Sequence, residues 1–562
     1  MNGALVFFLV ASVCFVAAEK SSDDQPLVAA PIGKIRGSIL TSRLGRKIYS
    51  FRGVRYGEPP TGHQRFQPPI PAKDWENFFD ASEEGPSCPY PDGVLQSEDC
   101  LRLNVYTTKL PSKTENVSRP VMIFIHPGGF YSFSGQSVLW GPQYIMDQDI
   151  VLVTINYRIG VLGFLSTGDS LLPGNMGLKD QVAAFRWVQR NIGAFGGNPN
   201  SVTLVGDSAG SFSIMLHMVS PMSTNLFHRA ICMSSSAMGP DPYSTISQNG
   251  QKELAKKQAE LIGCPTDTTG SMLLCFYSKP VENFTNTLDS LFDWYQAPVV
   301  LLKPTVEPES SKTERFLTAQ PYDLIVQRKF TNDVPLILGV TQGEFGGIAY
   351  LYTDPMLREL DQNWTTLAPI VFQYERDTPR SNYISKELRK FYFKDQPIDK
   401  NNLKGLHDIY TDSIVTFPMY RAAKLFATYS DRPVYFYKFT YQGRYSFRMY
   451  NDTTPIDVDH QDDLQYIFYI KQLFPYFESN APEIPMVEIM TSIWPSFVKT
   501  GEPIPKDNDK LKNVKWSTYV PAQTNFLDIN LRPTMKNVFF PERMREWEKL
   551  FPLPSASKMV KH

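Results

Sequence analysis

The stretch that decides the fold is VTLVGDSAGSFS, residues 202–213. Four apolar or β-branched residues, typical of a buried strand, run directly into the GDSAG segment at 206–210. A serine between two glycines at the end of a strand is typical of an elbow in which the chain turns sharply into a helix and exposes the hydroxyl. The residues that follow are apolar enough to form that helix. We therefore predict that Ser208 is a nucleophile.

A serine hydroxyl needs a neighbouring base before it can attack a carbonyl carbon. On this kind of elbow the chain order is serine, acid, histidine, so His407, His460 and the terminal His562 are the histidines to consider. His407 lies in a stretch that predicts a helix, whereas His460 lies in the polar loop at 455–468. Loops at strand ends are where a base can reach the serine, and we predict His460 as the base.

The acid should follow a strand between the serine and the histidine. Glu344 is the first carboxylate after the apolar run VPLILGV at 334–340, with Asp412 and Glu307 as weaker alternatives. A carboxylate in this role orients the imidazole and stabilises its cation without taking the proton itself.

A second loop is needed to bind the negative oxygen that forms on the attacked carbonyl. HPGGF at 126–130 follows another apolar run, and its glycines allow the backbone to approach a substrate closely. We predict that the N–H groups of Gly128, Gly129 and Ala209 form this oxyanion hole.

The remaining apolar runs predict an α/β protein. They are nearly continuous, as expected for strands buried on both faces of a parallel sheet. The stretch between two of them, 178–195, has apolar residues at helical spacing. We predict one large domain with a central, mostly parallel mixed sheet flanked by helices. The predicted strands are 121–126, 150–157, 202–207, 229–234, 334–340 and 434–441.

The N-terminus predicts export from the cell. Residues 4–18 form an apolar run that ends in small residues, which is typical of a signal peptide cleaved near Ala18. The alternative, a membrane anchor, needs about 20 apolar residues. We therefore expect a mature, secreted chain of residues 19–562 without a membrane anchor. The net charge of −1 argues against nucleic acid as a partner.

Cysteines and glycosylation motifs agree with an oxidising compartment. Local pairs, Cys88 with Cys100 and Cys264 with Cys275, could each close a short loop, while Cys232 lies in an apolar run and is expected to be a buried thiol. The N-x-S/T motifs predict glycosylation in a secreted chain. They lie at Asn116, Asn283, Asn363 and Asn451.

With these residues identified, the chain resembles the type-B carboxylesterases, the cholinesterase-like branch of the α/β-hydrolases, and in particular the secreted insect esterases. The resemblance spans nearly the whole mature chain. It implies the triad Ser208, Glu344 and His460, the oxyanion hole named above, the two local disulfides, and structural ion pairs Arg65–Glu98 and Arg158–Asp180. It rests on the motifs at 65–69, 97–106, 126–135, 157–166, 174–181, 195–210, 339–345 and 459–468.

The chain departs from the family pattern at several positions. Asp207 stands where the family has glutamate, or glutamine in juvenile hormone esterases, and its charge should lie near the leaving group. Pro127 replaces a glycine beside the oxyanion hole. Asp457 replaces a glycine three residues before His460, where a negative charge could alter the loop or favour a protonated histidine. The loop between Cys88 and Cys100 lacks the tryptophan that binds choline in cholinesterases.

These observations predict a secreted serine carboxylic-ester hydrolase that forms an acyl-enzyme and acts on apolar carboxylic esters. No metal or cofactor is implied. One alternative is a non-catalytic binding or adhesion protein of the same family. Narrower enzymatic alternatives are a juvenile hormone esterase, which Asp207 argues against, and a lipase, which would need an amphipathic lid.

Overall fold

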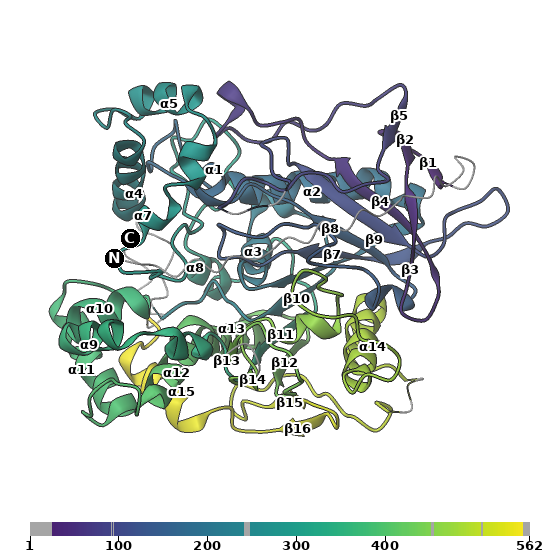
Figure 1. Ribbon diagram of the computed structural model, residues 1–562. Helices are drawn as coiled ribbons and strands as arrows, with labels where there is room; N and C mark the ends of the chain where they lie inside the picture. The colour runs from purple at the N-terminus through teal and green to yellow at the C-terminus, as the bar shows by residue number, and fades with distance from the viewer. Residues whose placement is uncertain are drawn as a thin grey trace, which may run out of the picture.

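The computed structural model describes residues 25–554, apart from 92, 94, 241–247, 451–453, 507 and 509. The predicted signal segment 1–18 therefore lies outside the described residues. One layer of strands runs across the molecule, from purple strands of the N-terminal part to yellow-green strands near the C-terminal part (Figure 1). The eleven strands lie in the order β16 (Thr534–Lys536), β15 (Phe526–Ile529), β12 (Val434–Phe439), β11 (Leu336–Thr341), β10 (Arg229–Met233), β9 (Gly197–Asp207), β7 (Arg119–Ile125), β8 (Val151–Ile155), β6 (Arg102–Thr107), β4 (Lys47–Arg55) and β3 (Ser38–Thr41).

The six strands predicted from apolar runs are β7 to β12, the centre of this sheet. These six strands pair in parallel with one another, and β15 extends the parallel part by one strand. Strands β8 and β11 are buried along their whole length, which is expected where both faces of a parallel sheet are covered. Their continuous apolar sequences follow from that burial.

The edges of the sheet are antiparallel. β6, β4 and β3 continue from β8 on one side, and β16 pairs with β15 on the other. The sheet is therefore mixed and mostly parallel, and the predicted α/β class is confirmed. A three-stranded sheet and a two-stranded pair lie outside it, formed by β1 (Leu27–Ala30), β2 (Gly33–Arg36) and β5 (Phe78–Asp80), and by β13 (Met449–Tyr450) and β14 (Thr454–Pro455).

Helices cover both faces of the sheet. Successive residues of β7 belong to two different hydrophobic clusters, Ile123 to the first and Phe124 to the second, because side chains alternate across a strand. The buried face of α2 (Met176–Asn191) joins the first cluster, and that of α14 (Ile484–Thr500) joins the second. The predicted helix at 178–195 corresponds to α2 and a following turn of 3₁₀ helix.

The other helices surround this core, and α9 to α12 gather at the lower left of Figure 1. Their bounds are α1 (Gly160–Phe164), α3 (Ala209–His217), α4 (Gln248–Leu261), α5 (Thr269–Ser278), α6 (Glu282–Thr285), α7 (Leu288–Leu291), α8 (Pro321–Val326), α9 (Asp354–Gln362), α10 (Trp364–Val371), α11 (Pro379–Phe393), α12 (Leu403–Thr411), α13 (Phe417–Tyr429) and α15 (Pro541–Leu550).

Both expected disulfides are present. Cys88 is bonded to Cys100 and Cys264 to Cys275, and Cys232 is a buried free thiol. The two ion pairs implied by the resemblance also form, with N–O distances of 2.6 Å for Arg65–Glu98 and 2.7 Å for Arg158–Asp180. These contacts tie the loops before β6 and after β8 to the helical layers.

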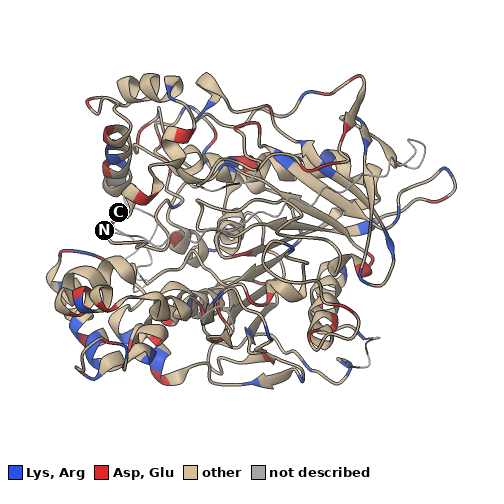
Figure 2. Ribbon diagram, viewed as in Figure 1, with Lys and Arg blue, Asp and Glu red and all other residues tan. Residues whose placement is uncertain are grey.

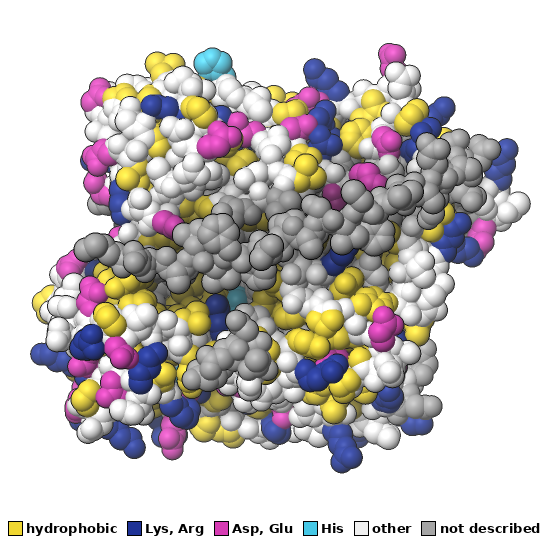
Figure 3. Space-filling view, in the orientation of Figure 1, with side chains coloured by type: hydrophobic (Ala, Val, Ile, Leu, Met, Phe, Trp, Pro, Cys, Tyr) yellow, Lys and Arg dark blue, Asp and Glu magenta, His cyan; other side chains and the backbone are white. Residues whose placement is uncertain are grey.

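The surface is mixed in charge. Acidic and basic residues are interspersed along the chain (Figure 2), and hydrophobic side chains are scattered among charged ones on the face shown in Figure 3. This distribution agrees with the net charge of −1. In the part of the chain that the structure describes, no helix combines the length and the apolar character needed to cross a bilayer.

Candidate active site

Ser208 lies at the sharp turn between β9 and α3. Its backbone has φ 53° and ψ −120°, a conformation that is strained for a residue with a side chain. Its N–H donates to Met233 O at 2.8 Å, which fixes the turn against β10. A Cβ on Gly210 would lie 2.1 Å from Ile125 O. Only glycine lets α3 approach β7 this closely, as the elbow motif predicted.

Glu344 and His460 meet beside this turn. His460 Nδ1 lies 2.6 Å from Glu344 Oε2, and Glu344 Oε1 accepts the N–H of Thr341 at 2.7 Å. Both side chains are buried. The contact with the carboxylate places a proton on Nδ1 and leaves Nε2 as an acceptor. The ring also stacks on Phe345, with centroids 3.9 Å apart, so its orientation is fixed from two sides.

His460 Nε2 is buried and has no hydrogen-bond partner among the described residues. It lines the same cavity as Ser208. Hydrogen bonds between a base and its nucleophile are often long without substrate and tighten in the complex. The orphaned nitrogen is therefore available to the serine hydroxyl.

The rival acids and bases lie elsewhere. Asp412 is paired with Arg543, and Glu307 with Lys179 at 2.7 Å. His407 lies in α12, as predicted, with its two ring nitrogens facing carboxylates. His562 lies outside the described residues.

The loop after β7 brings two glycines to the same cavity. Gly128 has φ 114°, and the amides of Gly128 and Gly129 have no acceptor among the described residues. Ala209 is the first residue of α3, where N–H groups lack an intrahelical partner. Pro127 belongs to a well-anchored segment, because its carbonyl accepts from His126 Nδ1 at 2.7 Å. Proline lacks only its own N–H, so it removes none of these three donors.

The cavity has a volume of about 310 Å³. Aromatic and aliphatic residues near the motif loops suggest Phe130, Phe133, Met238, Trp294 and the segment 434–450 as its walls. Phe130, Phe133 and, from that segment, Phe447 line it, whereas Met238 and Trp294 do not. Sequence reasoning missed several apolar or aromatic wall residues, although two directly follow residues that it had singled out. These are Tyr131, Phe212, Val299, Val300, Phe345 and Ile414.

A second compartment of about 530 Å³ adjoins the first. The two have part of their lining in common. Arg448 is the single lysine or arginine among the residues that line either compartment, and it lies 3.5 Å from the buried Asp459. The shared wall consists of Tyr131, Val299, Phe345 and Arg448.

Asp207 differs from what the sequence suggested. Its carboxyl is fully buried, and neither oxygen has a hydrogen-bond partner among the described residues. Burial, reinforced by the negative charges of Asp463 and Glu344, raises the pKa of Asp207 well above its usual range. Burial of the residue before the nucleophile therefore favours its protonated form over the carboxylate.

Asp457 also differs from expectation. Its carboxylate does not approach the His460 ring; Oδ2 lies 3.4 Å from His407 Nε2, and Oδ1 accepts the N–H of Val458 at 2.7 Å. The histidine that Asp457 contacts is therefore His407.

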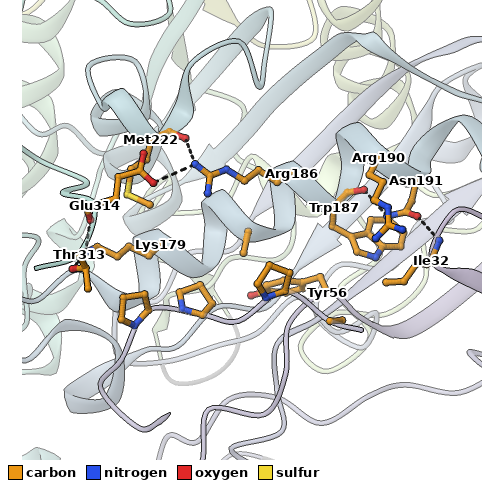
Figure 4. Close-up of a pocket in the computed structure, with 15 residues that line it drawn as sticks. Ile32, Tyr56, Lys179, Arg186, Trp187, Arg190, Asn191, Met222, Thr313 and Glu314 are labelled. Atoms are coloured by element: carbon orange, nitrogen blue, oxygen red, sulfur yellow. Dashed lines mark hydrogen bonds and ion pairs between the residues drawn. The ribbon is translucent and has the colours of Figure 1, made fainter. Parts of the chain in front are cut away.

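A further cavity, of about 370 Å³, lies along α2 (Figure 4). It contains none of the predicted site residues. Its arginines are already engaged, Arg186 with Met222 O and Glu314 and Arg190 with Asp74. This cavity is therefore separate from the one that holds Ser208.

The comparisons with known proteins identify the class. The model of the carboxylesterase family matches residues 24–547, and the chain therefore belongs to this family. It is a carboxylesterase with an α/β-hydrolase fold, and it hydrolyses esters. The resemblance stated from the sequence is confirmed.

Its relatives include insect esterases. The chain is 37% identical over 508 residues to Esterase FE4 of Myzus persicae, covering 87% of this chain and 86% of that protein. It is 32% identical over 560 residues to a juvenile hormone esterase of Tribolium castaneum, covering 94% and 92%. The crystal structure of juvenile hormone esterase from Manduca sexta, with OTFP covalently attached, matches with a TM-score of 0.83 and 28% identity, over 94% of this chain and 100% of that one.

Proposed function

We propose that the protein is a secreted serine carboxylesterase that uses Ser208, His460 and Glu344 to hydrolyse apolar carboxylic esters. The observation that carries this proposal is the meeting of Ser208 and His460 on one cavity, with Glu344 2.6 Å from the far nitrogen of the imidazole. Gly128, Gly129 and Ala209 line the same cavity, which supports their backbone amides as its oxyanion hole.

The reaction proceeds through an acyl-enzyme. Ser208 Oγ bonds to the ester carbonyl carbon while its proton passes to His460 Nε2. The resulting oxyanion accepts hydrogen bonds from the three backbone amides. The tetrahedral intermediate then expels the alcohol, which receives that proton from His460. Water repeats the sequence on the acyl-enzyme, and the acid and the free serine are released. Glu344 stabilises the imidazolium in each half.

The walls of the two compartments support an apolar substrate. Aromatic and aliphatic side chains make up most of the lining, and such pockets favour apolar ligands through burial of their surface. Two of the relatives are juvenile hormone esterases and another is Esterase FE4. Asp207, whose protonated form burial favours, stands where juvenile hormone esterases typically carry glutamine.

Secretion and processing complete the proposal. The two disulfides agree with an oxidising compartment, and removal of residues 1–18 would leave the mature chain 19–562. Asn116 and Asn363 are exposed and Asn283 is half-buried, which suits glycan attachment. Asn451 lies outside the described residues.

The test is hydrolysis of a panel of esters by the purified protein and its Ser208→Ala variant. The panel holds short-chain and long-chain aryl esters, a choline ester and juvenile hormone. Turnover of apolar esters that disappears in the variant is expected. A folded native protein that binds these esters without turnover would support the non-catalytic alternative, and turnover confined to juvenile hormone would support that narrower assignment.

A further inference from the structure

We propose that His407 is a positioning residue that holds the loop of Glu344 and the loop of His460 in register. The inference rests on the roles proposed above for those two residues. His407 touches neither the cavity of Ser208 nor the His460 ring. It acts through contacts with the two loops that carry the acid and the base.

The surroundings of His407 favour the protonated imidazolium over the neutral ring. The residue lies in α12 and is 8% exposed. Its Nε2 lies 3.4 Å from Asp457 Oδ2, and its Nδ1 lies 3.3 Å from Asp408 Oδ1. Both ring nitrogens therefore face carboxylate oxygens. A neutral imidazole has one N–H and can satisfy only one of them, whereas the imidazolium donates to both.

Through Asp457, His407 reaches the loop of the base. Asp457 lies three residues before His460, and its other oxygen accepts the N–H of Val458 at 2.7 Å and the side chain of Gln342 at 3.3 Å. Gln342 is in turn two residues before Glu344. One carboxylate thus joins α12, the base loop and the acid loop.

His407 and its helix also contact the acid loop directly. The ring packs against Gly346, where a Cβ would lie 2.4 Å from His407 Cδ2. One turn further along α12, Thr411 Oγ1 donates to Gly343 O at 3.0 Å. The N–H of Gly343 donates to Val458 O at 2.8 Å, so the two loops are also hydrogen-bonded to each other. The acid loop is therefore held between α12 and the base loop.

The charges around His407 keep it protonated at neutral pH. Burial lowers the pKa of His407, but the hydrogen bonds and charges of Asp408 and Asp457 outweigh it and raise the pKa to about 9. The same contacts hold the pKa of Asp457 below its usual range, although burial opposes this. Other charged and titratable groups surround this cluster. Lys404 Nζ lies 2.6 Å and Arg543 Nη1 lies 3.8 Å from Asp408. The Tyr350 ring faces His407 edge-on, and the positive charge of Lys438 interacts with Asp457.

The sign of the pH effect follows from the raised pKa. The bridge is intact at neutral pH and is lost as the pH rises through about 9. Its contribution to stability is full below the usual histidine pKa and is lost over the range between that pKa and about 9. Above that pH the neutral ring keeps only one of its two carboxylates. The base loop then loses its tie to α12, and the acid and base lose their alignment, so kcat should fall on the alkaline side.

The test is the dependence of kcat and KM on pH for an apolar aryl ester, between pH 6 and 10.5, with the Ser208→Ala variant as the blank at each pH. The variants are His407→Gln and Asp457→Asn, with His63→Gln, an exposed histidine, as the matched control. Thermal unfolding at each pH shows which samples are folded. Because misalignment of catalytic groups affects the chemical step, His407→Gln should lower kcat about tenfold at pH 7.5 with KM within about twofold.

The alkaline limb decides the proposal. In the native protein kcat should fall near pH 9; in His407→Gln this limb should disappear, and in Asp457→Asn it should move to lower pH. His63→Gln should match the native profile. An identical alkaline limb in both variants, or none in the native protein, would overturn the proposal. If His407→Gln does not fold, Asp457→Asn decides alone. Turnover equal in the native protein and in Ser208→Ala would instead overturn the proposed function.

Discussion

Nδ1 of His460 lies 2.6 Å from Oε2 of Glu344, although 116 residues separate them in the sequence. Glu344 follows β11, and His460 lies in a loop after β12, the strand beside β11 in the sheet. Because parallel neighbours end at the same edge of the sheet, loops that follow them can meet there. Ser208 follows β9, which lies two strands from β11, and it is therefore at the same carboxyl end of the parallel strands. The order of the strands thus assembles the site.

Replacing the acid tests its role in orienting the base. We expect Glu344→Gln to lower kcat by about 10³-fold or more, because an amide can donate to Nδ1, favour the wrong tautomer and fail to stabilise the imidazolium. The measurement is steady-state hydrolysis of an aryl ester, with the exposed Glu309→Gln as control. A loss of less than tenfold in the folded Glu344 variant would contradict this role.

The close approach of α3 to β7 predicts a specific intolerance at the elbow. In Gly210→Ala the new methyl group would lie 2.1 Å from Ile125 O, so the turn that presents Ser208 must shift. We expect kcat/KM to fall at least about 100-fold, as displacement of a catalytic group by about 1 Å costs that much. Gly193→Ala is the matched control, since nothing lies within 4 Å of its Cβ. Equal kcat/KM in the two variants would refute the prediction.

The buried carboxyl of Asp207 should behave as a neutral acid. We expect Asp207→Asn to keep kcat within about threefold, because an amide resembles a protonated carboxyl in shape and charge. Since the folded-state pKa is raised, burying this carboxyl costs stability at every pH above the ordinary aspartate pKa, and the cost disappears below about pH 4. The variant should therefore be more stable to urea than the native protein at pH 7.5, with the difference shrinking toward pH 4.5. A variant that is less stable at pH 7.5, or a loss of kcat beyond tenfold, would show that the ionised form is needed.

The disulfide between Cys264 and Cys275 should stabilise the fold without serving the site. It links the end of α4 to α5, and neither cysteine lines the cavity of Ser208. Closing a loop of this size contributes about 2–3 kcal/mol. We expect the Cys264→Ser, Cys275→Ser double variant to lose that much free energy of unfolding in urea and to keep its kcat at 25 °C. An unchanged urea midpoint would be the contrary result.

Local signals explain which parts could be predicted from the sequence. The central strands are continuous apolar runs, and Ser208 lies between two glycines in a recognisable elbow motif. The edge strands β3 and β16 are short and partly exposed, so no apolar run marks them. The cavity wall draws on segments far apart in the chain, as Phe212 and Ile414 show. The pairing of Asp457 with His407 could not be foreseen, because only the fold brings α12 against the base loop.

The most direct test of the central claim is covalent labelling of the nucleophile. The native protein is treated with an aryl phosphonofluoridate, and the modified peptide is located by mass spectrometry while activity is followed. The account predicts one phosphonyl group on Ser208 for each molecule inactivated, with no labelling of Ser208→Ala. Full inactivation with Ser208 unmodified, or full activity with Ser208 labelled, would contradict it.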